Sequence, residues 1–167
     1  MAFAINEILA KRKDRIIITR PVLEAGESLG FLPGTMEEKL YPYMLPIYDC
    51  IQKMVGKDGV QREMIDNAIE VAPLAYMRGR TMDNAVCIFD ESQNATYKHL
   101  KLYVTRLGEN SKMIITGDPC QSDLPESAQG LDTFVDRICD VPGVGLVTFK
   151  NDSIIRHPLI GKLLDRL

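Results

Sequence analysis

The chain of 167 residues has few cysteines and no excess of charge of one sign. None of its four cysteines lies at Cys-x-x-Cys spacing from another, which argues against a zinc site and a disulfide framework and indicates a reducing compartment. They are Cys50, Cys87, Cys120 and Cys139. Twenty basic against twenty-three acidic residues leave a formal net charge of −3. A field of that sign does not attract phosphate, so any nucleic-acid contact must come from a local basic patch.

Long apolar runs and a secretion signal are also lacking. No run approaches the roughly 18–20 residues needed to cross a bilayer. Asn6 and Glu7 interrupt the N-terminal apolar stretch, and its basic residues come after it, which is the reverse of a signal peptide. We therefore expect a soluble, cytoplasmic protein with no membrane partner.

The sequence does contain enough apolar residues, 46%, for a core, and its length fits one domain over residues 1–167. Short apolar runs typical of buried strands alternate with segments of helical periodicity. The predicted strands are 15–19, 69–73, 85–89, 112–116 and 145–149. The predicted helices are 3–9, 35–54 (bent at its two prolines), 62–67, 100–107, 131–138 and one after Pro158. This alternation predicts an α/β fold with a parallel sheet flanked by helices.

Two polar clusters follow two of these strands. Asp90 and Glu91 come directly after Ala85–Phe89, and a second cluster, Asp118 to Gln121, follows the next strand. Ligands of open α/β sheets bind outside the carboxyl ends of the strands, so we expect both clusters at one edge. In phosphate-loop nucleotide hydrolases, paired acids in this position hold Mg²⁺ and polarise the attacking water. The sequence nevertheless lacks Gly-x-x-x-x-Gly-Lys-[Ser/Thr], the loop that cradles phosphates.

Six motifs, in order along the whole chain, closely resemble the PhoH-like proteins. They are Thr19-Arg20-Pro21, the glycine-rich segment 24–34, Pro73–Thr81, Asp90–Asn94, Thr116–Asp123 and Arg156-His157-Pro158. The resemblance implies a phosphate-loop ATPase with a RecA-like core related to superfamily 1 helicases. It also implies ATP and Mg²⁺ as cofactors, homo-oligomeric rings, and RNA or other single-stranded nucleic acid as a partner.

The same resemblance implies roles for individual side chains. Asp90 resembles the Walker B acid that engages Mg²⁺ through water, and Glu91 resembles the general base for the attacking water. Gln121 resembles a sensor of the γ-phosphate, supported by Asp118, and Gln93 lies within reach of the phosphate region.

Four arginines are candidates for phosphate or partner contacts. Arg156 is a candidate transition-state cation, acting within its own subunit or across a subunit boundary. Arg20 occupies a place that resembles a helicase strand-contact motif. Arg78 and Arg80 are candidates for a neighbouring site or a nucleic-acid strand, and fit equally well as solvated or ion-paired turn residues.

The chain departs from the family at its N-terminus. In the family, a strand and a glycine-rich Lys-Thr loop precede the helix with which this sequence begins. We therefore expect the fold to lack its first strand and phosphate loop, and Met1 to be an internal methionine of a longer protein. That strand would lie centrally, between the fourth and fifth predicted strands, unless another chain or a rearranged edge fills the gap.

Two other functions are compatible with the residues. One is a non-catalytic nucleic-acid-binding or assembly module that keeps the fold without turnover. The other is a nuclease with metal held among Asp90, Glu91, Asp118 and Asp123, a scheme in which Gln121 has no purpose.

Overall fold

The structure is a computed structural model that describes residues 1–21 and 36–149. It falls into two compact units, Met1–Phe134 and Val135–Leu167. That the whole chain forms one domain stays a prediction. No helix in the described part of the chain is both long enough and apolar enough to cross a membrane.

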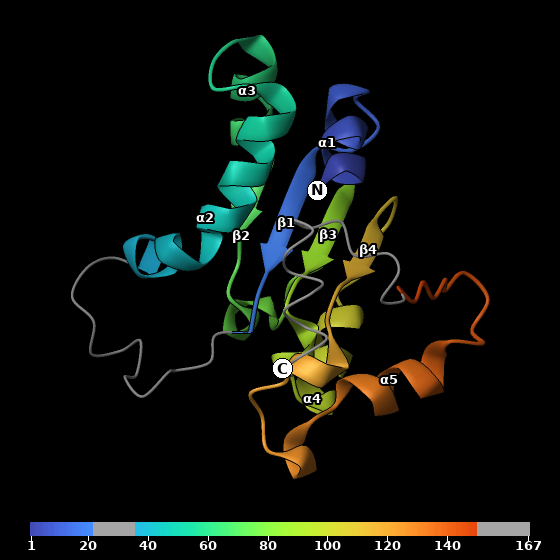
Figure 1. Ribbon diagram of the computed structural model, residues 1–167. Coiled ribbons are helices and arrows are strands. Elements are labelled where there is room, and N and C mark those ends of the chain that lie inside the picture. Colours follow the sequence, from blue (N-terminus) through green and yellow to red (C-terminus); the bar gives the residue numbers. More distant parts are fainter. Residues whose placement is uncertain (22–35, 150–167) are drawn as a thin grey trace. The chain divides into compact units, whose positions relative to one another are not determined.

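The first unit contains a four-stranded parallel sheet with the strand order β2-β1-β3-β4. Its strands are β1 (Arg15–Thr19), β2 (Ile69–Val71), β3 (Ala85–Phe89) and β4 (Lys112–Ile115). The arrows of β1, β3 and β4 run the same way in Figure 1. The predicted α/β class, a parallel sheet flanked by helices, is confirmed.

The two middle strands are buried on both faces, as their unbroken apolar sequences predict. Ile16, Ile17 and Ile18 of β1 are completely buried, and so is every residue of β3 except Ile88, which is 6% exposed. Because successive side chains point to opposite faces, each strand contributes to two layers of core.

Three helices cover one face of the sheet: α1 (Ala2–Leu9), α2 (Met36–Val55) and α3 (Val60–Ala68). Their buried side chains pack with Ile16, Ile18, Val86 and Ile88 into one cluster. The helical members of that cluster are Ala4, Ile5, Ile8, Met44, Ile47, Ile51, Ile65 and Ala68. The ribbon of α2, which contains two prolines, changes direction along its length in Figure 1, as the sequence predicts.

On the other face, β3 packs against α4 (Tyr97–Val104), which in turn contacts the short helix η1 (Leu74–Met77). Phe89 of β3 contacts Tyr103 of α4, with ring centroids 4.7 Å apart. The remaining helices of the described residues are η2 (Ser92–Asn94), η3 (Pro119–Gln121), η4 (Glu126–Ala128) and α5 (Leu131–Ile138).

One predicted strand is wrong. Residues 145–149 form no strand, and their side chains are exposed, Val147 by 75% and Phe149 by 82%. An apolar run becomes a strand only where a neighbour completes its hydrogen-bond ladder, and no described residue pairs with this one. The predicted helix after Pro158 and the glycine-rich segment 24–34 lie outside the described residues.

The burial of Cys87 in β3 should make its thiol less reactive than the exposed thiols of Cys120 and Cys139. Burial raises the pKa of Cys87 to about 11, whereas Cys120 and Cys139 are exposed. At pH 8 only about one Cys87 thiol in a thousand is then ionised, and alkylation needs the thiolate. We expect iodoacetamide to modify Cys120 and Cys139 in the native protein, and Cys87 only after denaturation. Mass spectrometry of the labelled peptides checks this, and native labelling of Cys87 at the rate of Cys120 would contradict the structure.

Candidate functional site

The parallel register brings three polar residues together at the carboxyl end of the sheet. Thr19 is aligned with Phe89, and Phe89 with Ile115, so the next residue of each chain segment emerges at the same level. These residues are Arg20, Asp90 and Thr116. Backbone bonds continue the ladder there, from Asp90 N to the Thr19 oxygen (3.0 Å) and from Thr116 N to the Phe89 oxygen (2.8 Å).

Asp90 lies in the middle of this row and uses both of its carboxylate oxygens. Oδ1 accepts from the Thr116 hydroxyl at 2.7 Å, and Oδ2 accepts from Arg20 Nε at 2.9 Å. Burial raises the pKa of Asp90, but the hydrogen bonds from Thr116 and Arg20 outweigh it, and the net shift is downward. Asp90 is therefore a carboxylate at neutral pH, with its side chain 27% exposed.

Glu91 turns the chain sharply out of the sheet. Its backbone is left-handed (φ 55°, ψ 39°), a conformation uncommon for a residue other than glycine, and it leads directly into η2. Its side chain is exposed, and one of its oxygens, Oε2, accepts from Gln93 Nε2 at 2.7 Å. The neighbouring acids thus differ: Asp90 is held within the sheet edge, and Glu91 is presented to solvent.

Gln93 links the first polar cluster to the second. Its side chain is only 3% exposed, and its Oε1 accepts from the backbone N–H of Asp118 at 3.2 Å. The Asp118 carboxylate in turn accepts from Gln121 Nε2 at 2.5 Å. Glu91 and Gln121 therefore lie at the same edge, connected through Gln93 and Asp118. Because the Gln93 amide donates to Glu91 and accepts from Asp118, it holds the two clusters together.

Sequence patterns did not indicate several supporting contacts. Ser122 Oγ donates to the Gln93 carbonyl at 2.9 Å. Asn94 and Asp123 form a reciprocal pair, with Asn94 Nδ2 donating to Asp123 Oδ2 (3.0 Å) and Asp123 N donating to Asn94 Oδ1 (2.8 Å). The sequence did contain a signal for the bond from Thr116 to Asp90. Each of these residues directly follows an apolar run, and the two runs are consecutive predicted strands.

The predicted arginines fall into different environments. Arg20 is bonded to Asp90, and Arg80 Nη1 lies 2.5 Å from Glu70 Oε1 in β2, the ion-paired arrangement that the sequence left open. Arg78 is exposed and forms no ion pair with any residue that the structure describes. Arg156 lies outside the described residues.

The acidic side chains at this edge are arranged for a metal ion held by one protein carboxylate rather than by several. Within residues 1–21 and 36–149, no three His, Cys, Asp or Glu side chains are close enough to hold a metal ion together. The four-acid cluster of the nuclease hypothesis is therefore not assembled. Mg²⁺ is commonly bound by one or two carboxylates, several waters and the phosphates of a substrate, and Asp90 fits that requirement.

Fold and site together define an α/β protein of the RecA-like type, with polar clusters at the carboxyl ends of β3 and β4. The model of the family "PhoH-like protein" matches residues 1–167, and the chain belongs to this family. It is 47% identical to the PhoH-like protein of Bacillus subtilis over 152 residues, covering 90% of this chain and 48% of that protein.

Other relatives agree with this assignment. The chain is 44% identical to the PhoH-like protein of Mycobacterium bovis over 166 residues, covering 99% of this chain and 47% of that protein. It is also 44% identical to the protein PhoH of Escherichia coli over 167 residues, covering 98% of this chain and 47% of that protein. The chain thus spans about half the length of the curated relatives it matches.

Proposed function

We propose that this chain supplies the magnesium, water and γ-phosphate contacts of an ATP hydrolase that acts on nucleic acid, RNA in particular. The observation that carries the proposal is the connection of Glu91 to Gln121 beside the ionised Asp90. Membership of the PhoH-like family and its resemblance to helicase-type ATPases supply the reaction and the partner.

Each side chain has a chemical role in this proposal. Asp90 would hold a magnesium ion through water, and its bonds to Thr116 and Arg20 set its orientation. Bound Mg²⁺ neutralises charge on the phosphate oxygens. Glu91, exposed and ionisable, accepts the proton of the attacking water, and Gln121 offers amide hydrogens to the terminal phosphate.

Arg20 links the site to the proposed nucleic-acid function. Its guanidinium bonds to Asp90, so a strand contact at Arg20 would act directly on the residue that holds the metal. Arg78 is exposed and is a further candidate for contact with an external phosphate. Arg156 is retained as a candidate transition-state cation from the sequence alone.

Binding of labelled ATP tests the proposal. The triphosphate would be held by a phosphate loop, which these 167 residues do not contain. We expect this chain alone to bind and hydrolyse ATP at or near background. A protein extended upstream to include Gly-x-x-x-x-Gly-Lys-Thr should bind ATP and hydrolyse it with Mg²⁺.

Two results would contradict the proposal. One is clear Mg²⁺-dependent turnover by this chain alone that Glu91→Gln abolishes, which would mean that no phosphate loop is needed. The other is an extended protein that binds RNA but neither binds nor hydrolyses ATP, which would favour the non-catalytic module. Measuring RNA binding and ATP binding on the same preparations separates the two.

A further inference from the structure

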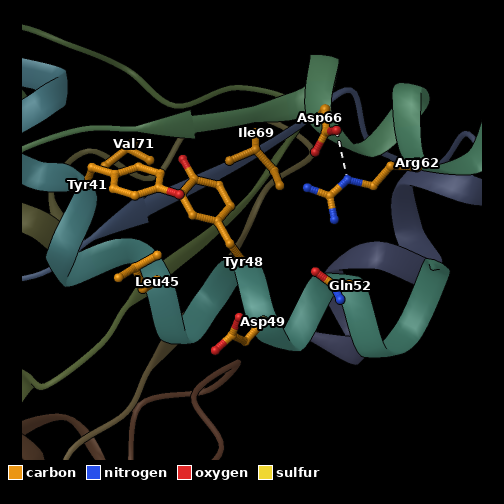
Figure 2. Close-up of a pocket in the computed structure, with 9 residues that line it drawn as sticks. All are labelled: Tyr41, Leu45, Tyr48, Asp49, Gln52, Arg62, Asp66, Ile69 and Val71. Carbon is orange, nitrogen blue, oxygen red and sulfur yellow. Dashed lines mark hydrogen bonds and ion pairs between the residues drawn. The ribbon is translucent and has the colours of Figure 1, made fainter. Parts of the chain in front are cut away.

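A cavity lined by none of the proposed site residues lies between α2, α3 and the edge strand β2. Its volume is about 490 Å³. Figure 2 shows that side chains of α2 form one wall and that residues of α3 and β2 form the other. No motif of the sequence analysis points to this cavity, and the proposed ATP site does not use it.

One end of the cavity is lined by tyrosine rings and aliphatic side chains. Tyr41, Leu45 and Tyr48 lie four and three residues apart, so they share one face of α2. The tyrosine rings are 5.9 Å apart and inclined by 30°, and Ile69 and Val71 lie on the opposite wall. Tyr41 is 56% exposed, an unusual position for a large aromatic side chain that serves only the core.

The other end presents hydrogen-bond donors next to acceptors. Arg62 Nε donates to Asp66 Oδ2 at 2.7 Å, which uses one N–H of the guanidinium and one carboxylate oxygen. Among the described residues no other hydrogen bond occupies the remaining guanidinium N–H groups or the second carboxylate oxygen. Figure 2 shows the amide of Gln52 rising from α2 toward Arg62, and an amide supplies both a donor and an acceptor.

We propose that this cavity binds a purine base, presented either by a free nucleoside or by an unpaired residue of single-stranded nucleic acid. Bases outside a duplex stack on aromatic side chains and bond through the donors and acceptors along their edges. Both requirements are met here, by the tyrosines at one end and by Gln52, Arg62 and Asp66 at the other. A purine is favoured over a pyrimidine because its larger ring covers more of the tyrosine surface.

Charge and strand length argue against other occupants. Asp49, Asp66 and Arg62 leave the lining without a positive excess, so a phosphate is not the group that the cavity anchors. A peptide added as a further strand is disfavoured because β2 has only three residues, and the N–H of Ile69 already donates to the Ile65 oxygen.

Nucleosides without phosphate, in buffer without Mg²⁺, test the cavity independently of the ATP proposal. We expect adenosine and guanosine, titrated into the full chain, to shift backbone NMR signals of α2, α3 and β2. Uridine and cytidine should bind more weakly. Tyr41→Ala should raise the Kd of the purine nucleosides by about 5- to 100-fold, since it removes a stacking surface. Gln52→Ala, at an exposed position, should weaken binding and reduce discrimination between bases.

Tyr76→Ala is the matched control, because Tyr76 is also 56% exposed but lies in η1. It should leave the Kd unchanged, and an equal loss in both tyrosine variants would overturn the proposal. So would the absence of NMR shifts with every nucleoside, or shifts confined to Asp90 and Gln121.

An unstructured oligoadenylate distinguishes the two sources of the base. If it binds more tightly than adenosine and this gain is lost with Tyr41→Ala, the site belongs to nucleic acid. Equal affinity per base assigns it to the free nucleoside.

Discussion

Replacing Glu91 by Gln is expected to lower ATP turnover about 10²- to 10⁴-fold in a protein that carries both this chain and a phosphate loop. In the proposed function the exposed carboxylate of Glu91 is the general base, and an amide of the same shape cannot accept the proton of the attacking water. The new carbonyl oxygen can still accept from Gln93 Nε2, so the connection to Asp118 should persist. ATP affinity should consequently change by no more than a few fold.

Steady-state hydrolysis and equilibrium ATP binding, measured on the same protein, check this split. Glu63→Gln is a suitable control, because Glu63 is an exposed acid of α3 and the substitution makes the same change of charge. It should leave turnover within about twofold of the parent, as surface substitutions away from special features usually do. Turnover that survives Glu91→Gln, or falls equally with Glu63→Gln, would remove Glu91 from the role of base.

The sequence predicted the central part of the fold well, because its signals there are local. β1 and β3 are unbroken apolar runs between polar residues, and both occur with the predicted bounds, Arg15–Thr19 and Ala85–Phe89. The meeting of Asp90 with the cluster after β4 also followed from local signals, since parallel strands end at a common edge.

Features that depend on contacts between segments far apart in the sequence could not be predicted from these local patterns. Residues 145–149 have the composition of a strand, yet no ladder partner completes them among the described residues. The bond between Arg20 and Asp90 depends on the register of two strands 70 positions apart. The cavity beside β2 needs α2 and α3 to lie against the same edge, and no spacing within either helix specifies that.

The close approach of Gly130 to α4 gives the largest expected change in stability. A Cβ at this buried position would lie 2.1 Å from Tyr97 N and 2.6 Å from the carbonyl carbon of Thr96. These are backbone atoms at the first turn of α4, where the Thr96 hydroxyl accepts from His99 N, so no side-chain rotation relieves the overlap. Gly130→Ala should therefore destabilise the protein by about 3 kcal/mol, the upper range for overpacking, and lower its Tm by about 6–12 °C.

Gly145→Ala separates this steric effect from the general effect of replacing glycine. A Cβ at Gly145 would meet nothing within 4 Å, and its φ does not lie in the left-handed region. That substitution reduces the freedom of the unfolded chain and should leave the Tm unchanged or slightly higher. Thermal unfolding followed by circular dichroism compares the two variants. Equal melting temperatures would mean that the segment before Leu131 does not pack against the start of α4. They would also contradict the neighbouring contact of Tyr97 with Phe134, whose ring centroids are 6.1 Å apart.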